Sequence, residues 1–219
     1  MGQSLLTPLQ GKLLGAISKD SYITSQFFLT GGTALSEFYF KHRFSEDFDL
    51  FSEKPFDPKR IIAWVGEAKE KIGFEKVEQQ GLTGQEIFYF STGTEFVRVE
   101  FAYFPFPHLG NFKKYNLLNI SSVEDICINK IHAITTRKRA RDYFDLFLCI
   151  PHLGWQTHDI TKNYRLKFDV SLSAEQLATS FTNVLDAQDE PRFLGEVDWE
   201  EVKKYFLGLT KELKKELVK

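Results

Sequence analysis

The stretch Asp47-Phe48-Asp49 places two carboxylates two residues apart in a short apolar segment. Side chains alternate along a strand, so in a strand over residues 47–51 both aspartates point to one face while Phe48 points into the core. Two like charges this close repel each other, and a nearby cation relieves the repulsion. The pair therefore indicates either a cation site or the solvated end of a strand.

Two further features of the sequence favour the cation site. Gly31, Gly32 and Thr33 stand between an apolar stretch and a helical pattern, where backbone N–H groups can approach a phosphate. Glu100 lies in a strongly strand-forming stretch, and a carboxylate flanked by apolar residues must face water, a cation or a cleft. If its strand neighbours that of Asp47 and Asp49, Glu100 becomes a third carboxylate of the same group.

Three carboxylates form a hard oxygen site of the kind that Mg²⁺ prefers. Two such ions, about 3.5–4 Å apart, can clamp an in-line phosphoryl displacement. One ion would hold a triphosphate, the other would lower the pKa of an attacking hydroxyl, and the Gly-Gly-Thr turn would hold phosphates. The pattern therefore predicts phosphoryl chemistry at this site.

A second candidate group lies in the C-terminal half. Lys130 interrupts an otherwise apolar helical stretch, and Arg137 lies two helical turns further on, so the two side chains share a face. Asp142 could position a neighbouring cation or contact a nucleotide. Asp145 could instead pair with Arg141, one turn before it.

Other common catalytic patterns are missing from the sequence. There is no Gly-x4-Gly-Lys-[Ser/Thr] loop and no Gly-x-Ser-x-Gly elbow. The five histidines have no metal-ligand spacing, and the two cysteines form neither a CxxC pair nor a disulfide framework.

The N-terminal half reads as a mixture of helices and strands. We expect a helix over 7–19, a turn at 31–33 between a strand and a helix, and a helix over 58–72 capped by Asp57 and ended by Gly73. Gly81, Gly84 and Gly93 fit hairpin loops between strands. The expected strands are 27–30, 47–51, 74–79, 86–91 and 95–104.

The C-terminal half reads as helical. A helix should begin after Ser122, and Pro151 should stop the helix that follows over 139–150. Residues 151–172 show no regular pattern, and two amphipathic helices are expected over 173–186 and 198–219. We therefore predict an α/β (α+β) fold with two parts, an α/β core over 1–115 and a helical region over 116–219 that completes the nucleotide cleft.

The overall charge limits the possible partners. The 219 residues carry 28 Lys+Arg and 30 Asp+Glu, which gives a net charge of −2 and excludes a chain-wide polyphosphate binder of the histone kind. The sequence begins without a signal-peptide pattern and lacks the roughly 20 apolar residues of a membrane span. We expect a cytoplasmic protein without a membrane partner.

Two blocks of the sequence resemble the AbiEii/AbiGii toxin family, within the polymerase-β-like nucleotidyltransferase superfamily. The first is LTGGTALSEFYFKHRFSEDFDLF (29–51), which contains Gly-Gly-Thr-Ala-Leu followed by Arg43, Ser45, Asp47 and Asp49. The second is KIHAITTRKRARDYFDLF (130–147), which matches Lys-x6-Arg and then [Lys/Arg]-Asp-x2-Asp-Leu. The blocks occur in the family's order, although Glu100 stands where the superfamily commonly has Asp.

The resemblance implies a short mixed β-sheet flanked by helices, followed by a helical C-terminal part. It also implies Mg²⁺-dependent transfer of a nucleotide from an NTP to a hydroxyl acceptor. Family members are commonly toxins of bacterial toxin–antitoxin or abortive-infection systems, and some modify the acceptor end of tRNA. We therefore expect tRNA as the acceptor and an antitoxin protein encoded beside the gene.

The resulting site hypothesis assigns a role to each matching residue. We expect Asp47, Asp49 and Glu100 to bind metal as the catalytic carboxylates, with Glu100 also taking the proton of the acceptor. Nucleotide-binding roles are expected for Gly31, Gly32 and Thr33 around phosphate, for Lys130 and Arg43 as neutralising cations, and for Asp142 on the nucleotide side.

Two alternatives stay open from the sequence. The acceptor could be a small molecule such as an aminoglycoside, or a protein hydroxyl. The chain could also be an inactive copy of the fold that acts as a binding module, although unpaired carboxylates without a function would cost stability.

Overall fold

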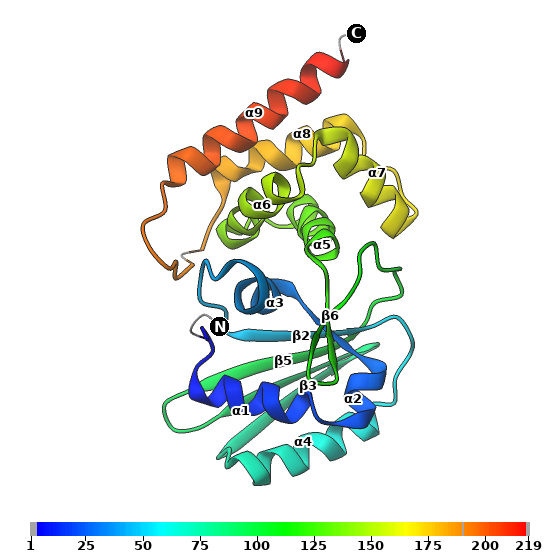
Figure 1. Cartoon of the computed structure of the whole chain (residues 1–219), viewed down its shortest axis with the longest axis vertical. Helices are drawn as coiled ribbons and strands as arrows, with labels where there is room; N and C mark the ends of the chain where they lie inside the picture. Colours follow the sequence, from blue (N-terminus) through cyan, green and yellow to red (C-terminus); the bar gives the residue numbers. More distant parts are fainter. Residues whose placement is uncertain (1–3, 190, 218–219) are drawn as a thin grey trace. The chain divides into compact units, whose positions relative to one another are not determined.

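The chain forms two compact units in a computed structural model that describes residues 4–189 and 191–217 (Figure 1). The first unit comprises the chain up to Pro107 together with Asn111–Ser121. The second comprises His108–Gly110 and the chain from Ser122 onward. The chain thus enters the second unit briefly, returns to the first, and then enters the second unit again.

The strands of the first unit form one mixed sheet. Across the described residues it has seven strands in the order β3-β4-β5-β2-β1-β7-β6. β2 pairs with β5 and β1 with β7 in parallel, and the other neighbours are antiparallel. The strands are β1 (Phe28–Thr30), β2 (Asp47–Ser52), β3 (Lys76–Leu82), β4 (Gln85–Ser91), β5 (Phe96–Tyr103), β6 (Lys113–Tyr115) and β7 (Leu118–Ile120). The predicted mixed sheet with flanking helices is therefore confirmed.

The helices of the first unit begin where their capping residues predict. Thr7 and Gln10 form a capping box at α1 (Pro8–Ile17), and Asp57 caps α4 (Pro58–Ile72), which ends at Gly73 in the left-handed region. The others are α2 (Ser21–Gln26), α3 (Gly31–Leu35) and a π-helix, η1 (Ser36–Phe40), that continues α3.

Alternation along the strands gives the sheet one apolar and one polar face. Phe48 and Phe101 are fully buried, and the ring of Trp64 from α4 packs edge-on against Phe101. α4 therefore covers the apolar face, which is where the core of this unit lies. Asp47 and Asp49 point to the opposite face and stay partly exposed.

The second unit consists of helices. They are α5 (Val123–Thr136), α6 (Ala140–Leu153), α7 (Thr157–Phe168), α8 (Ala174–Thr182), the 3₁₀-helix η2 (Asn183–Asp186) and α9 (Trp199–Leu217). Fully buried Tyr143 and Phe181 both pack against Phe206, with ring centroids 5.2 and 5.4 Å away. This aromatic group joins α6, α8 and α9.

A buried carboxylate anchors the short segment that visits the second unit. Asp125 accepts hydrogen bonds from the backbone N–H of Leu109 at 3.0 Å and of Gly110 at 3.1 Å. Lys167 donates to the same carboxylate at 2.6 Å, and both charged side chains are almost completely buried. The ion pair therefore fixes His108–Gly110 against α5 and α7.

Three sequence predictions in the N-terminal half were incomplete or wrong. Residues 31–33 are not a turn, because α3 begins directly at Gly31 with a positive φ of 75°. Gly81 lies inside β3 rather than in a loop. The β6–β7 hairpin was missed because its strands have three residues each, too short for alternation to show.

Two predictions failed in the C-terminal half. Pro151 does not stop α6, which runs on to Leu153 and ends at Gly154 in the left-handed region. Proline lacks an N–H but fits helical φ, and few residues follow it in the helix. Residues 151–172 are not irregular, because α7 buries Ile160, Tyr164 and Phe168 at intervals of four residues.

Among the described residues, none of the helices combines the length and the apolar character that crossing a membrane requires.

Candidate active site

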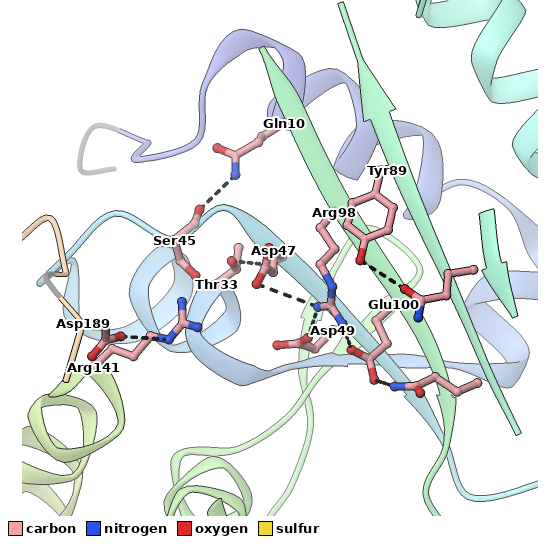
Figure 2. Close-up of polar contacts among 12 residues, drawn as sticks. Gln10, Thr33, Ser45, Asp47, Asp49, Tyr89, Arg98, Glu100, Arg141 and Asp189 are labelled. Carbon is pink, nitrogen blue, oxygen red and sulfur yellow. Dashed lines mark hydrogen bonds and ion pairs between the residues drawn. The ribbon is translucent and has the colours of Figure 1, made fainter. Parts of the chain in front are cut away.

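Parallel pairing of β2 with β5 brings the predicted carboxylates together. Asp49 lies opposite Glu100 in the register, and Asp47 lies opposite Arg98. Residues opposite each other on neighbouring strands project to the same face, so all four side chains share the polar face of the sheet (Figure 2). The condition under which Glu100 joins the two aspartates is therefore met.

Arg98 lies among the three carboxylates. Its Nη1 atom is 3.8 Å from Asp47 Oδ2 and 3.7 Å from Asp49 Oδ1, and its Nη2 donates a hydrogen bond to Glu100 Oε2. Burial alone would lower the pKa of Arg98, but Glu100 and the two aspartates outweigh it and raise that pKa. The guanidinium is thus a permanent positive charge at the centre of the group.

Both oxygens of Glu100 accept hydrogen bonds. Gln85 on β4 donates from Nε2 to Oε1, and Arg98 donates to Oε2. The Glu100 side chain is 13% exposed, less than Asp47 at 34% and Asp49 at 24%. The two aspartates are therefore the more accessible carboxylates of the group.

The glycines at the start of α3 lie against this group. A Cβ added to Gly31 would overlap Oδ2 of Asp49, so only glycine fits both this contact and the positive φ. The hydroxyl of Thr33 donates to the backbone carbonyl of Asp47 and ties α3 to β2. The Gly-Gly-Thr segment therefore lies in contact with both aspartates, and its predicted role in holding phosphate stays a prediction.

The guanidinium of Arg43 lies against Gly32 at the start of α3. A Cβ at Gly32 would overlap its guanidinium, and its Nη1 donates to the carbonyl of Phe44 at 3.1 Å. Only 4% of Arg43 is exposed. The predicted role of Arg43 as a triphosphate ligand stays a prediction, and its contacts here support the glycine-rich segment.

Lys130 and Asp142 belong to a charged group within the second unit. The Lys130 amine is 2.6 Å from Asp142 Oδ1 and 2.8 Å from Asp145 Oδ2, and Arg137 Nε donates to Asp142 Oδ2 at 2.7 Å. Burial alone would raise the pKa of Asp142, but Lys130 and Arg137 reverse the effect and lower it. The nucleotide-binding roles of Lys130 and Asp142 stay predictions.

Asp145 does not pair with Arg141, the partner that its spacing in the sequence suggested. It contacts Lys130 on α5, whereas Arg141 pairs with Asp189 at 3.4 Å. The one-turn spacing between Arg141 and Asp145 therefore does not decide the partner of Asp145.

The donor chemistry near Asp47 and Asp49 suits a divalent cation. Carboxylate oxygens are the ligands that Mg²⁺ prefers, and the buried Thr30 hydroxyl, in register with Asp49, lacks a hydrogen-bond partner in the described structure. Among the described residues, no three His, Cys, Asp or Glu side chains stand as a ready metal-binding group. The two aspartates fit a metal, and the third ligand stays a prediction.

Sequence reasoning missed Arg98 and Gln85. The alternation in Val97-Arg98-Val99-Glu100 was visible and places Arg98 on the face of Glu100. Gln85 gives no such signal, because its position depends on the hairpin that pairs it with Ala102.

Several known proteins are similar to this chain. The "Uncharacterized protein aq_aa25" of Aquifex aeolicus (strain VF5) is 31% identical over 194 residues, covering 87% of this chain and 89% of that protein. The crystal structure of JHP933 from Helicobacter pylori shares the fold with a TM-score of 0.60 at 22% identity, over 94% of this chain and 91% of that one. A putative nucleotidyltransferase from H. pylori gives the same score and identity over 94% of both chains.

A family profile extends the likeness across both units. The profile described as "Nucleotidyl transferase AbiEii toxin, Type IV TA system" matches residues 12–215, which include the aspartates of β2 and the charged group of α5 and α6. With the nucleotidyltransferase fold and the paired carboxylates in place, the chain belongs to the AbiEii family of nucleotidyl transferase toxins and is a transferase of that class.

Proposed function

We propose that this enzyme transfers a nucleotide from an NTP to a hydroxyl of tRNA in a Mg²⁺-dependent reaction, as the toxin of a toxin–antitoxin pair. The observation that carries the proposal is the placement of Asp47 and Asp49 side by side on the polar sheet face, with Gly31 against Asp49. Family membership supports nucleotidyl transfer as the reaction.

Asp47 and Asp49 are the residues that would hold the metal. Bound there, Mg²⁺ would neutralise charge on the triphosphate and lower the pKa of the acceptor hydroxyl. In the transfer, the hydroxyl oxygen forms a bond to the α-phosphorus, the bond from that phosphorus to the β-phosphate oxygen breaks, and pyrophosphate leaves. The hydroxyl proton passes to a base, and Glu100 is the residue expected to take this proton.

Other residues of the chain would bind the nucleotide. The backbone at Gly31 and Gly32 would contact phosphate, with Lys130, Arg43 and Asp142 in the nucleotide-binding roles expected from the family pattern. Each oxygen of Glu100 accepts one hydrogen bond, from Gln85 or from Arg98. A ligand or base role for Glu100 would use the remaining lone pairs of these oxygens.

The toxin role and the acceptor come from the family. A type IV toxin–antitoxin family implies an antitoxin protein, which we place in the neighbouring gene. The sequence resemblance includes members that modify the acceptor end of tRNA, which makes tRNA the first acceptor to test.

The test is incubation of the protein with each labelled NTP, Mg²⁺ and total tRNA. We expect label in the tRNA fraction with wild-type protein and none with Asp49→Asn, because a neutral amide oxygen binds a divalent cation much more weakly than a carboxylate does. Thermal melting should show that Asp49→Asn still folds, since it removes one of two neighbouring like charges.

The matched control is Glu67→Gln, which removes an exposed carboxylate paired with Lys71 on α4. It should transfer label like the wild type. Near-normal transfer by Asp49→Asn would show that this carboxylate does not hold a metal. Label on a protein or a small molecule instead of tRNA would contradict the proposed acceptor.

A further inference from the structure

The guanidinium of Arg98 contacts the three carboxylates unequally. It donates a hydrogen bond to Glu100, whereas its contacts with Asp47 and Asp49 are ion pairs at 3.8 and 3.7 Å, beyond hydrogen-bond length. Arg98 is therefore held by Glu100 and only attracted by the aspartates.

Glu100 is in turn held by a neutral donor. Gln85 on the adjacent strand β4 donates a hydrogen bond to Oε1 of Glu100, the oxygen that does not bond to Arg98. The chain Gln85–Glu100–Arg98 thus fixes the guanidinium beside Asp47 and Asp49, and each oxygen of Glu100 accepts one hydrogen bond. Figure 2 shows the contact between Glu100 and Arg98.

A divalent cation and Arg98 are attracted to the same two aspartates. A guanidinium cannot lose its proton at any pH that the fold survives, so it cannot relieve the conflict by becoming neutral. A cation bound by both aspartates would face this positive charge across a few ångströms, which opposes binding unless Arg98 moves.

We propose that Arg98 is a built-in competitor of the metal ion: positioned by Glu100, it neutralises Asp47 and Asp49 and must give up both contacts when a divalent cation binds them. In this arrangement Glu100 is a positioning residue for Arg98 and not a metal ligand. The inference rests on the proposed function, since it takes Asp47 and Asp49 as the metal-binding residues.

The experiment measures binding of Mn²⁺ to the full chain without nucleotide, by the loss of the free-ion electron paramagnetic resonance signal. We expect Arg98→Gln to bind Mn²⁺ about tenfold more tightly than the wild type, because the competing charge is gone. Lys71→Gln is the matched control, as it removes one positive charge from an exposed pair on α4. It should leave the affinity unchanged.

A double variant tests the role given to Glu100. Arg98→Gln with Glu100→Gln removes one charge of each sign, so it also serves if the single variant fails to fold. We expect it to bind Mn²⁺ at least as tightly as the wild type. Binding well below the wild type would show that Glu100 is a ligand and would overturn the inference.

The outcomes separate this inference from the proposed function. If the wild type binds Mn²⁺ and Arg98→Gln binds it equally or more weakly, Arg98 is no competitor and this inference alone fails. If neither the wild type nor any variant binds Mn²⁺, the metal site of the proposed function fails, and the inference fails with it.

Discussion

The amine of Lys130 has two carboxylate partners, and this changes what its removal should do. The sequence placed Lys130 in an apolar stretch from which its amine must reach something polar, and in the structure Asp142 and Asp145 meet it. Both aspartates are completely buried. Removing Lys130 would therefore leave buried negative charge with less compensation.

We expect Lys130→Ala to lower the free energy of unfolding by about 3–5 kcal/mol, the usual cost of removing one partner from a buried pair. Urea denaturation measures this loss. Lys138→Ala, which breaks an exposed pair with Asp186, should cost at most about 1 kcal/mol. Equal losses in the two variants would mean that the buried group does not stabilise the helical unit.

His132 should give the stability a small dependence on pH near neutrality. Burial lowers the pKa of His132 below its usual value, and Tyr164 lies at hydrogen-bond distance, 2.9 Å from Nδ1. The folded state therefore favours the neutral ring. The neutral ring of His132 contributes fully to stability above its pKa in the unfolded chain, about 6.5. This contribution is lost as the pH falls toward the lower pKa of His132 in the folded state.

The expected result is a melting temperature that decreases between pH 7.5 and pH 5, more in the wild type than in His132→Gln. Glutamine can still bond to Tyr164 but does not titrate. The difference should be small because the ring is partly exposed. Identical pH profiles would show that His132 is not responsible.

At the scale of elements, the start of α3 links the backbone to the site. Gly31 combines a φ of 75° with direct contact to Asp49. We expect Gly31→Ala to destabilise the chain by at least about 1–2 kcal/mol, the cost of a left-handed residue, and to displace the Asp49 carboxylate.

Gly66→Ala is the matched control for this substitution. Gly66 lies within α4, where a Cβ would meet nothing within 4 Å. Alanine is the better helix former, so this variant should be more stable by about 0.5–1 kcal/mol in denaturant unfolding. A loss of stability at Gly66, or none at Gly31, would contradict the local geometry.

Elements with strong end signals were predictable, and elements fixed by tertiary contacts were not. Thr7, Asp57 and Gly73 predicted helix ends because each satisfies backbone groups locally. The three-residue strands β6 and β7 carry no periodicity, and β1 provides the partner that orders β7. The π-helix η1, which continues α3, was likewise not predicted.

The same distinction applies to the candidate site. The alternation in Asp47-Phe48-Asp49 predicted one shared face, and the strand around Glu100 proved to be its neighbour. The position of the Arg98 guanidinium beside Asp47 depends on the register between β2 and β5, two strands that lie far apart in the sequence. A single sequence does not specify this register.

For the whole molecule, ligand binding should raise the melting temperature. Magnesium neutralises the aspartates and a triphosphate completes its shell, so we expect Mg²⁺ and NTP together to raise the melting temperature more than either alone. Ligand at a hundred times its dissociation constant stabilises the folded state by about 2.7 kcal/mol. Differential scanning fluorimetry at millimolar ligand measures the shift.

Asp49→Asn is the control for this measurement, because it should lose the joint effect and keep the melting temperature of the free protein. If no NTP shifts the wild type in the presence of Mg²⁺, the chain is better described as an inactive binding module.

The anchored segment His108–Gly110 has a consequence for cutting the chain into parts. Because Asp125 holds the N–H groups of Leu109 and Gly110, a peptide that ends at Ser121 carries part of the second unit without its acceptor. A protease that cleaves after Ser121 would nick the backbone and still leave two pieces joined by these bonds. The gene therefore cannot be divided at one codon into two self-sufficient halves, and genetic exchange of either unit must carry this segment along.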